Sequence, residues 1–356
     1  MTTGMMKKKE IKKVLIARTL LLSLIAGAFA LGIFIGAGMG LFTPLSTVKS
    51  ESMSGGGEGT FKFIRDSMDT KDTQVRLPGK DVKPVEDNVK ARIDEMLKQG
   101  GIADASVYFL DLDTGNGFGI KEHEKFIPVS LLKIPLMIAY FKWAETNPLV
   151  LRKMLTYTTA HEADEEGLVR PAKQLEPGQA YTVNDLIYRM IAYDDLAAYA
   201  LLYAKLPAGR LEKIFQDLNV AYDPHRQENS LSLNVFAAFY RVLFNASYLS
   251  EEMSEKALRY LSRSLFRDGM SSGIPPNIDI ASRHGERMIP IMEDGEEKEL
   301  IQVYECGIIY HPNRPFLFGI LVRGADSGKL VTAIRDITHL VYEEVDQQSH
   351  RAANSH

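Results

Sequence analysis

The sequence predicts an α+β fold, an α/β sandwich, preceded by one transmembrane helix. β-rich segments lie near both ends of the folded region, at about 105–120 and 300–323, and a long helical stretch separates them. Since strands from both ends must share one sheet, the intervening helices are expected to form a separate lobe. A closing helix is expected at about 329–345, where apolar residues recur on one face.

The composition is that of a globular protein, with 45% apolar and 25% charged residues in a chain of 356. The net charge of −4 gives no electrostatic reason to expect a nucleic-acid partner. The single cysteine, Cys306, excludes an intramolecular disulfide and an iron–sulfur cluster, and its apolar surroundings at 303–310 indicate a buried thiol. The eight histidines show no metal-binding spacing, so no metal or cofactor is expected.

The N-terminus combines a basic segment, 1–18, with 24 uncharged residues at 19–42. As a helix these would span about 36 Å, enough to cross a bilayer. The flanking lysines predict a cytoplasmic N-terminus and a folded domain outside the cytoplasm, in a single-pass membrane protein. A cleaved signal peptide is the alternative, because Ala28-Phe29-Ala30 resembles a cleavage site. The apolar run continues past this point, which favours an uncleaved signal anchor.

Gly32, Gly36 and Gly40 recur every four residues in this span, a spacing that permits close helix–helix contact. A homodimer through these glycines is therefore a hypothesis, although glycine is also common in membrane helices that do not associate. Residues 43–84 are polar, charged and poor in apolar periodicity, which predicts a flexible linker.

The folded domain is expected at 85–346. Val89, Ile93 and Leu97 predict an amphipathic helix that ends at Gly100-Gly101. A hairpin is expected next, with strands at 105–111 and 118–120. The ten-residue end of the chain, 347–356, is expected to be a disordered tail. Further helices are expected at 149–157, 182–192, 195–204, 209–217, 232–245 and 251–265, and strands at 300–310 and 315–323.

Ser130 opens an apolar run that reads as a buried helix, and Lys133 follows three positions later. At this spacing the amine lies one turn on from the hydroxyl and on the same face. Burial would lower the pKa of the lysine, so it could act as a base toward the serine. The backbone N–H groups at the helix start could stabilise negative charge.

The same four-residue pattern also arises by chance, and a second copy at Ser46 and Lys49 lies in the predicted linker. Taken alone, Ser130 could be a helix N-cap, with Lys133 extending to the surface. The context of the motif must decide between the two interpretations.

Residues 85–345 resemble the class A β-lactamase and penicillin-recognising serine hydrolase family. The segment 107–115 is similar to the first hairpin of the family, and 126–135 to its nucleophile helix. Segments 175–186 and 274–286 resemble the approaches to its second and third motifs. The resemblance implies an antiparallel sheet, a Ser130 acyl-enzyme and Lys133 as general base.

The second motif of the family is Ser-Asp-Asn, and the corresponding residues in this sequence are Asp194-Asp195-Leu196. A carboxylate replaces the proton-shuttling hydroxyl, and a leucine replaces the amide that would hold substrate. A one-residue shift would instead read Tyr193-Asp194-Asp195 as a variant of the Tyr-x-Asn motif, with Tyr193 transferring the proton. Tyr193, Asp194 and Asp195 are therefore all candidates for the proton relay.

The third motif, Lys-Thr-Gly in the family, is Arg283-His284-Gly285. By the resemblance Arg283 could bind a substrate carboxylate, and an arginine can do so with two parallel hydrogen bonds. His284 brings a bulkier titrating ring, and Gly285 would keep the strand edge open. The oxyanion hole would be formed by the backbone N–H groups of Ser130 and Glu286. No deacylation base is assigned.

A carboxylate close to Lys133 would favour its protonated form, which cannot accept the proton of the serine. Two hypotheses follow. The chain is either a membrane-anchored serine hydrolase acting on β-lactams or D-alanyl cell-wall peptides, or an inactive domain that binds wall material or a partner protein. Retention of Ser130 and Lys133 favours the first, and the altered motifs favour the second.

Overall fold

A computed structural model describes residues 61–65, 81–127, 132–158, 174–223, 230–293 and 296–353. The chain divides into two units, 1–58 and 59–356, and all described residues belong to the second. The expected membrane span at 19–42, its glycines and Ser130 lie outside the described residues. Within the described ranges, no helix has the length and apolar character needed to span a bilayer.

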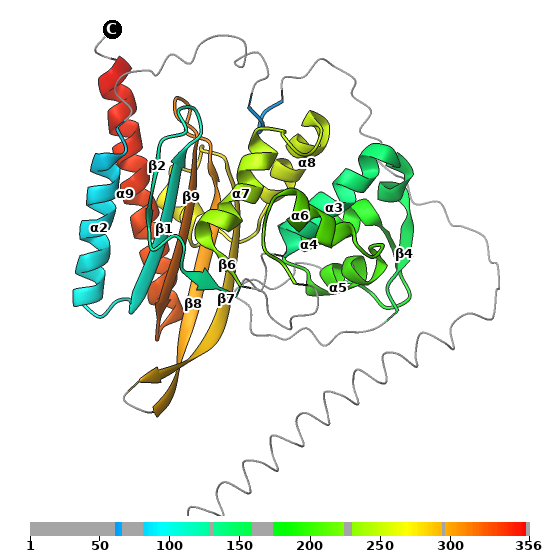
Figure 1. Ribbon diagram of the computed structural model, residues 1–356, viewed down its shortest axis with the longest axis horizontal. Helices are drawn as coiled ribbons and strands as arrows, with labels where there is room; N and C mark the ends of the chain where they lie inside the picture. Colours follow the sequence, from blue (N-terminus) through cyan, green and yellow to red (C-terminus); the bar gives the residue numbers. More distant parts are fainter. Residues whose placement is uncertain are drawn as a thin grey trace, which may run out of the picture. The chain divides into compact units, whose positions relative to one another are not determined.

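The central element is a five-stranded antiparallel sheet in the order β2-β1-β9-β8-β7 (Figure 1). The first two strands along the chain therefore pair with the last three, and this confirms a sheet assembled from both ends of the domain. The strands are β1 (Asp104–Asp111), β2 (Gly117–Ile120), β7 (Ile280–Glu293), β8 (Glu296–Ile309) and β9 (Phe316–Gly324).

Helices cover both faces of this sheet. On one face, α2 (Lys83–Lys98) packs beside α9 (Ser327–Ala353), and the helical lobe lies against the other face through α7 (Leu233–Phe244) (Figure 1). Each face has its own hydrophobic cluster of buried side chains. The lobe also contains α3 (Lys133–Thr146), α4 (Val183–Ala192), α5 (Leu196–Lys205), α6 (Arg210–Asp217) and α8 (Glu251–Leu261).

Helix α3 forms the core of the lobe, as its apolar sequence predicts. Every residue from Lys133 to Phe141 is buried, and α3 contacts α4, α5, α6 and α8. Such burial on all sides is typical of a central helix in a packed lobe. The smaller elements are β3 (Lys125–Phe126), η2 (Pro148–Arg152), β4 (Met154–Thr156), β5 (Ala180–Thr182), β6 (Leu231–Ser232) and η3 (Met270–Gly273).

Two helix predictions need correction. The segment 149–157 forms the 3₁₀ turn η2 and the strand β4, because the chain becomes extended at Lys153 and pairs with β5. Helix α8 ends at Leu261 rather than at 265, and the backbone N–H of Leu265 bonds to the carbonyl of Ala192 instead. In both places a tertiary backbone contact overrides local helical preference.

Part of the predicted linker belongs to the domain. Phe63 and Ile64 are buried, and the backbone N–H of Phe63 donates to Glu255 Oε2 at 2.7 Å. The ring of Phe63 contacts that of Tyr310 edge-on, with centroids 5.1 Å apart. These two apolar residues explain why 61–65 packs on the domain, although its surroundings in sequence are polar.

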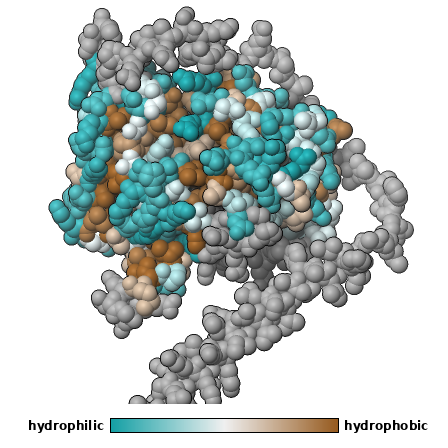
Figure 2. All heavy atoms as spheres, in the orientation of Figure 1, coloured by the Kyte–Doolittle hydropathy of each residue, from teal (hydrophilic) through white to brown (hydrophobic). Residues whose placement is uncertain are grey.

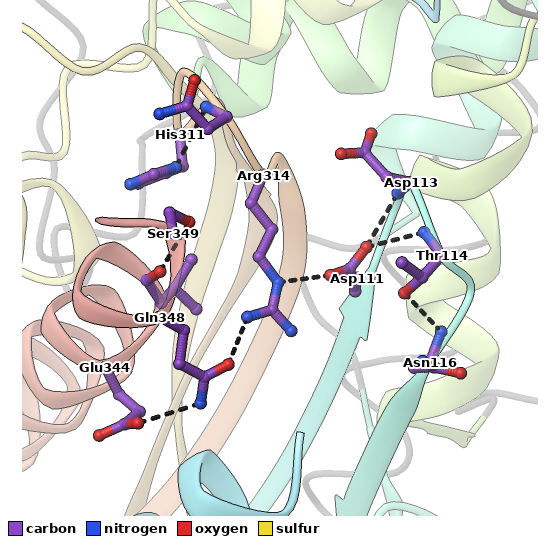
Figure 3. A network of polar contacts seen from close by, with 11 residues as sticks. Asp111, Asp113, Thr114, Asn116, His311, Arg314, Glu344, Gln348 and Ser349 are labelled. Carbon is purple, nitrogen blue, oxygen red and sulfur yellow. Dashed lines mark hydrogen bonds and ion pairs between the residues drawn. The ribbon is translucent and has the colours of Figure 1, made fainter. Parts of the chain in front are cut away.

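The predicted disordered tail is also wrong in part, because α9 continues to Ala353. Gln348 explains the extension: it donates to Glu344 Oε1 at 3.0 Å within the helix and accepts from Arg314 Nη1 at 2.7 Å. The same arginine donates through Nε to Asp111, and both of these charged side chains are fully buried (Figure 3). The network thus joins the ends of β1 and α9 to the turn before β9.

The sequence predicts no strand at the position of β7, and β8 begins before the expected start at 300. The pairing of β7 with β8 extends from Ile280↔Ile309 to Glu293↔Glu296, whereas the pairing of β8 with β9 ends at Ile301↔Gly324. The two strands therefore project beyond the sheet, and apolar side chains lie on this projection (Figure 2). Met288 and Met292 are 54% and 71% exposed. Charged residues interrupt the apolar pattern there, so periodicity alone misses these strand ends.

Candidate functional site

The first residue of α3 is Lys133, whose amine is buried in a side chain that is only 1% exposed. Its amine donates a hydrogen bond to the backbone carbonyl of Asp194 at 3.1 Å and contacts the Asp194 carboxylate directly. Lys133 is therefore not extended to the surface, and the structure rules out the surface-lysine interpretation of the motif. Ser130 is not among the described residues, so its contacts are not part of this geometry.

Asp194 occupies the connection between α4 and α5 in a left-handed backbone conformation, with φ = 58°. Aspartate tolerates this conformation better than most residues. Its neighbour Asp195 has a different role, because it is the N-cap of α5 and its Oδ1 accepts from the N–H of Ala198 at 3.0 Å. The left-handed turn and the cap together direct the Asp194 carboxylate toward α3.

Arg283 reaches the same carboxylate from strand β7. Its Nη2 donates to Asp194 Oδ1, the oxygen that Lys133 contacts, and its Nη1 donates to the carbonyl of Ile191 at 2.9 Å. The arginine side chain is 1% exposed. Both Nη groups therefore have partners inside the protein, and the third-motif cation serves to join the sheet to the lobe.

The electrostatics shift Lys133 toward its neutral form. Burial, and secondly the charge of Arg283, lower the pKa of the lysine well below its usual value, while Asp195 acts in the opposite direction. Contact with Asp194 also favours the ammonium form, but Asp194 shares its charge with Arg283. Burial lowers the pKa of Arg283 to about 10, which leaves the guanidinium charged at neutral pH. The pair Asp194–Arg283 is then electrically balanced without a proton on Lys133.

A neutral lysine amine has two N–H groups and one lone pair. The two oxygens of Asp194 that Lys133 contacts, one carboxylate and one carbonyl, can accept both N–H groups. The lone pair then remains available to accept a proton. The arrangement can therefore perform general base chemistry, and Asp194 acts as the residue that orients the base.

Successive residues of a strand point in opposite directions, so His284 lies on the opposite face of β7 from Arg283, whereas Gly285 lies on the same face. His284 is 3% exposed and stacks on Phe266 with ring centroids 3.9 Å apart. Burial lowers the pKa of His284 well below its usual value, so its ring is neutral. Gly285 gives space to Tyr304, because a Cβ there would overlap the Tyr304 hydroxyl. Burial raises the pKa of the half-buried Glu286.

Tyr193, considered above as a proton-transfer group, ends α4 and packs edge-on against Tyr188, with centroids 5.4 Å apart. Leu196 begins α5 and is 45% exposed. Of the nine predicted site residues, the structure thus brings Lys133, Asp194 and Arg283 into direct contact. Asp195 lies beside them as a helix cap, and His284 points away.

Sequence reasoning missed Glu305, a fully buried carboxyl on β8. Its Oε1 accepts from Ser282 Oγ at 2.7 Å and its Oε2 from the N–H of Met270 at 2.8 Å. Burial raises its pKa to about 7, although both hydrogen bonds and the charge of Arg267 act against this shift. The signal in the sequence is one glutamate inside the apolar run at 303–310.

Two neighbouring aspartates should respond differently to the same substitution. Asp194→Asn removes the charge that Lys133 and Arg283 share, and should lower the free energy of unfolding by about 3–5 kcal/mol. Asp195→Asn keeps an oxygen that can cap α5, and should cost at most about 1 kcal/mol. Urea unfolding followed by circular dichroism checks both. Equal losses would contradict the assignment of the two roles.

Glu305 should make stability depend on pH. Its pKa is about 7 in the folded state and 4.5 in the unfolded state, so the folded state retains a proton that the unfolded state releases as the pH rises. Stability from this group is full below pH 4.5 and falls as the pH rises toward 7. Glu305→Gln should therefore gain about 2–3 kcal/mol relative to the parent between pH 5 and pH 8. Glu299→Gln, at an exposed glutamate, should give the same dependence of unfolding free energy on pH as the parent protein. If the Glu305→Gln curve also runs parallel to that of the parent, the prediction is wrong.

Solved structures with this fold match the chain over nearly their whole length. The structure of PBP-A matches with a TM-score of 0.60 and 19% identity, over 73% of this chain and 96% of that one. A class A β-lactamase from Mycobacterium abscessus gives 0.60 and 18%, over 72% and 99%. A β-lactamase from Xanthomonas campestris pv. campestris gives 0.58 and 18%, over 73% and 98%.

At such identities the structural likeness shows the fold. Comparison with curated proteins gave no match. The sequence model described as the beta-lactamase enzyme family matches residues 88–345, nearly all of the domain that holds Lys133, Asp194 and Arg283. The chain belongs to the beta-lactamase enzyme family.

Proposed function

We propose that the chain is a serine acyl hydrolase in which Ser130 is the nucleophile and Lys133 the general base. The observation that carries the proposal is the buried lysine whose pKa is lowered and whose acceptor oxygens come from one residue, Asp194. A lysine that serves only packing would not need an arginine to neutralise its neighbouring carboxylate. Family membership and the three-residue spacing of serine and lysine give further support.

In the proposed reaction, Ser130 Oγ forms an ester bond to the acyl carbon as its proton passes to Lys133 Nζ. The bond to the leaving group then breaks, and the leaving group takes up this proton. Water hydrolyses the acyl-enzyme to a carboxylic acid and regenerates the serine. Asp194 and Arg283 remain paired throughout, so they hold the base in place without exchanging protons. β-Lactams and D-alanyl peptides are the first substrates to test.

The alternative is a catalytically inactive domain that binds cell-wall material or a partner protein. The observation that favours it is the loss of two substrate contacts expected in the family: Arg283 is buried and internally bonded, and Leu196 occupies the position of an amide. Under this alternative, Ser130→Ala would leave the function of the protein in its host unchanged.

The uncharged span at 19–42 supports a further part of the proposal, that the enzyme is held at a cell membrane with its folded domain outside the cytoplasm. Its glycines at four-residue spacing support self-association of the span. Deleting residues 1–42 should move the protein from the membrane fraction to the soluble fraction. Gly36→Leu should keep it in the membrane and weaken cross-linking of dimers. Membrane association without residues 1–42 would contradict the proposed anchor.

Acylation should require both members of the pair. Incubation with a fluorescent penicillin, followed by intact-mass measurement, should give a covalent adduct that Ser130→Ala abolishes and Lys133→Met reduces at least about 100-fold. Since the base must be unprotonated, the acylation rate should rise with pH, with its midpoint well below 10.5. Lys142→Met, at a partly exposed lysine on the same helix, is the control. An adduct that survives Ser130→Ala would refute the assignment.

A further inference from the structure

We infer that the preferred substrates carry an apolar acyl group and no carboxylate beside the bond that is broken. The inference rests on the proposed function, since it names the substrate class of the same site. It comes from two independent observations: the burial of the side chains that could bind an anion, and the exposure of two leucines next to Asp194.

The first observation concerns Arg283 and His284. Arg283 is 1% exposed, and its two Nη groups donate to Ile191 and Asp194. The ring of His284 is neutral and stacked on Phe266. Because Arg283 is buried, a substrate carboxylate would reach its Nη groups only by displacing the Asp194 carboxylate or the carbonyl of Ile191, and the Asp194–Arg283 pair would lose its bond. The third motif therefore does not select anionic substrates.

The second observation concerns Leu196 and Leu265, which are 45% and 44% exposed. Leu196 lies two residues after Asp194, at the start of α5. Leu265 lies in the segment after α8, and its backbone N–H donates to the carbonyl of Ala192 at 3.0 Å. Leu196 and the hydrogen-bond partner of Leu265, Ala192, each lie two residues from Asp194 in the chain, and both leucine side chains are exposed to solvent.

Covering this apolar surface with an apolar group is favourable, because both surfaces leave water. Covering it with a polar group is unfavourable, because the polar group loses its hydrogen bonds to water. A peptide amide placed on Leu196 would find no hydrogen-bond partner in that side chain. An alkyl or aryl acyl group would cover it favourably, by up to about fourfold in kcat/KM for each buried methylene group. The site is therefore suited to acyl esters or amides with an aliphatic or aromatic acyl group.

The test uses the full chain in detergent and p-nitrophenyl acetate, butyrate and hexanoate, with each rate divided by the alkaline hydrolysis rate of the same ester. We expect kcat/KM to rise at least about tenfold from acetate to hexanoate. Leu196→Asn and Leu265→Asn should each reduce this ratio several-fold. Leu149→Asn, at a 70%-exposed leucine on η2, should leave it unchanged. Nitrocefin should be a poorer substrate than the hexanoate ester.

A small alkyl fluorophosphonate separates the two possible failures. It forms a phosphorus–oxygen bond to a reactive serine and releases fluoride, without depending on an acyl site. Suppose that the fluorophosphonate labels Ser130 but kcat/KM does not rise from acetate to hexanoate, or that Leu196→Asn leaves this rise unchanged. Either result would overturn the substrate class and leave the proposed function standing. Failure to label Ser130, together with no ester hydrolysis, would overturn both.

Discussion

The site depends on one carboxylate that a buried lysine and a buried arginine share. Asp194 contacts Lys133 on helix α3 and Arg283 on strand β7, so a single oxygen ties the lobe to the sheet. The Arg283 guanidinium, buried without this charge, would carry a large desolvation penalty. The Asp194 carboxylate therefore fixes the position of the Lys133 amine. Because the Arg283 guanidinium neutralises this carboxylate, its charge no longer holds a proton on Lys133.

This arrangement reassigns the altered motifs. An aspartate in place of the shuttling hydroxyl looks at first like the loss of a catalytic residue, since a carboxylate beside a lysine favours the ammonium form. The arginine of the third motif supplies the compensating charge from the opposite side. The new carboxylate and the retained third-motif cation are thus complementary: Arg283 balances the charge of Asp194, and the two form a neutral pair beside the Lys133 amine.

The rest of the fold holds these elements at fixed positions. Helix α3 is buried from Lys133 to Phe141, so its first residue cannot move to the surface without opening the lobe. Arg314 and Asp111 form a second fully buried ion pair, which fastens α9 and the end of β1 to the turn before β9. Strand β7 is in turn paired with β8 along its full length, so Arg283 is set in register by fourteen residue pairs.

The sequence by itself determined the architecture: strands from both ends of the domain, a helical lobe and a buried helix in the apolar run that Ser130 opens. These features follow from hydrophobic periodicity, which depends only on residues that are close together in the sequence. It also identified Lys133, Asp194 and Arg283 as candidates. Only the tertiary structure decided which of them make contact. Lys133 lies 61 positions from Asp194 in the sequence and Arg283 lies 89 positions from it, so the oxygen that they share leaves no local pattern. The same holds for Glu305, for the burial of Phe63 and Ile64 and for the helical end of α9, whose partners lie on other elements. Burial and charge balance are properties of the assembled fold, and they make Arg283, expected to bind a substrate carboxylate, the counterion of Asp194.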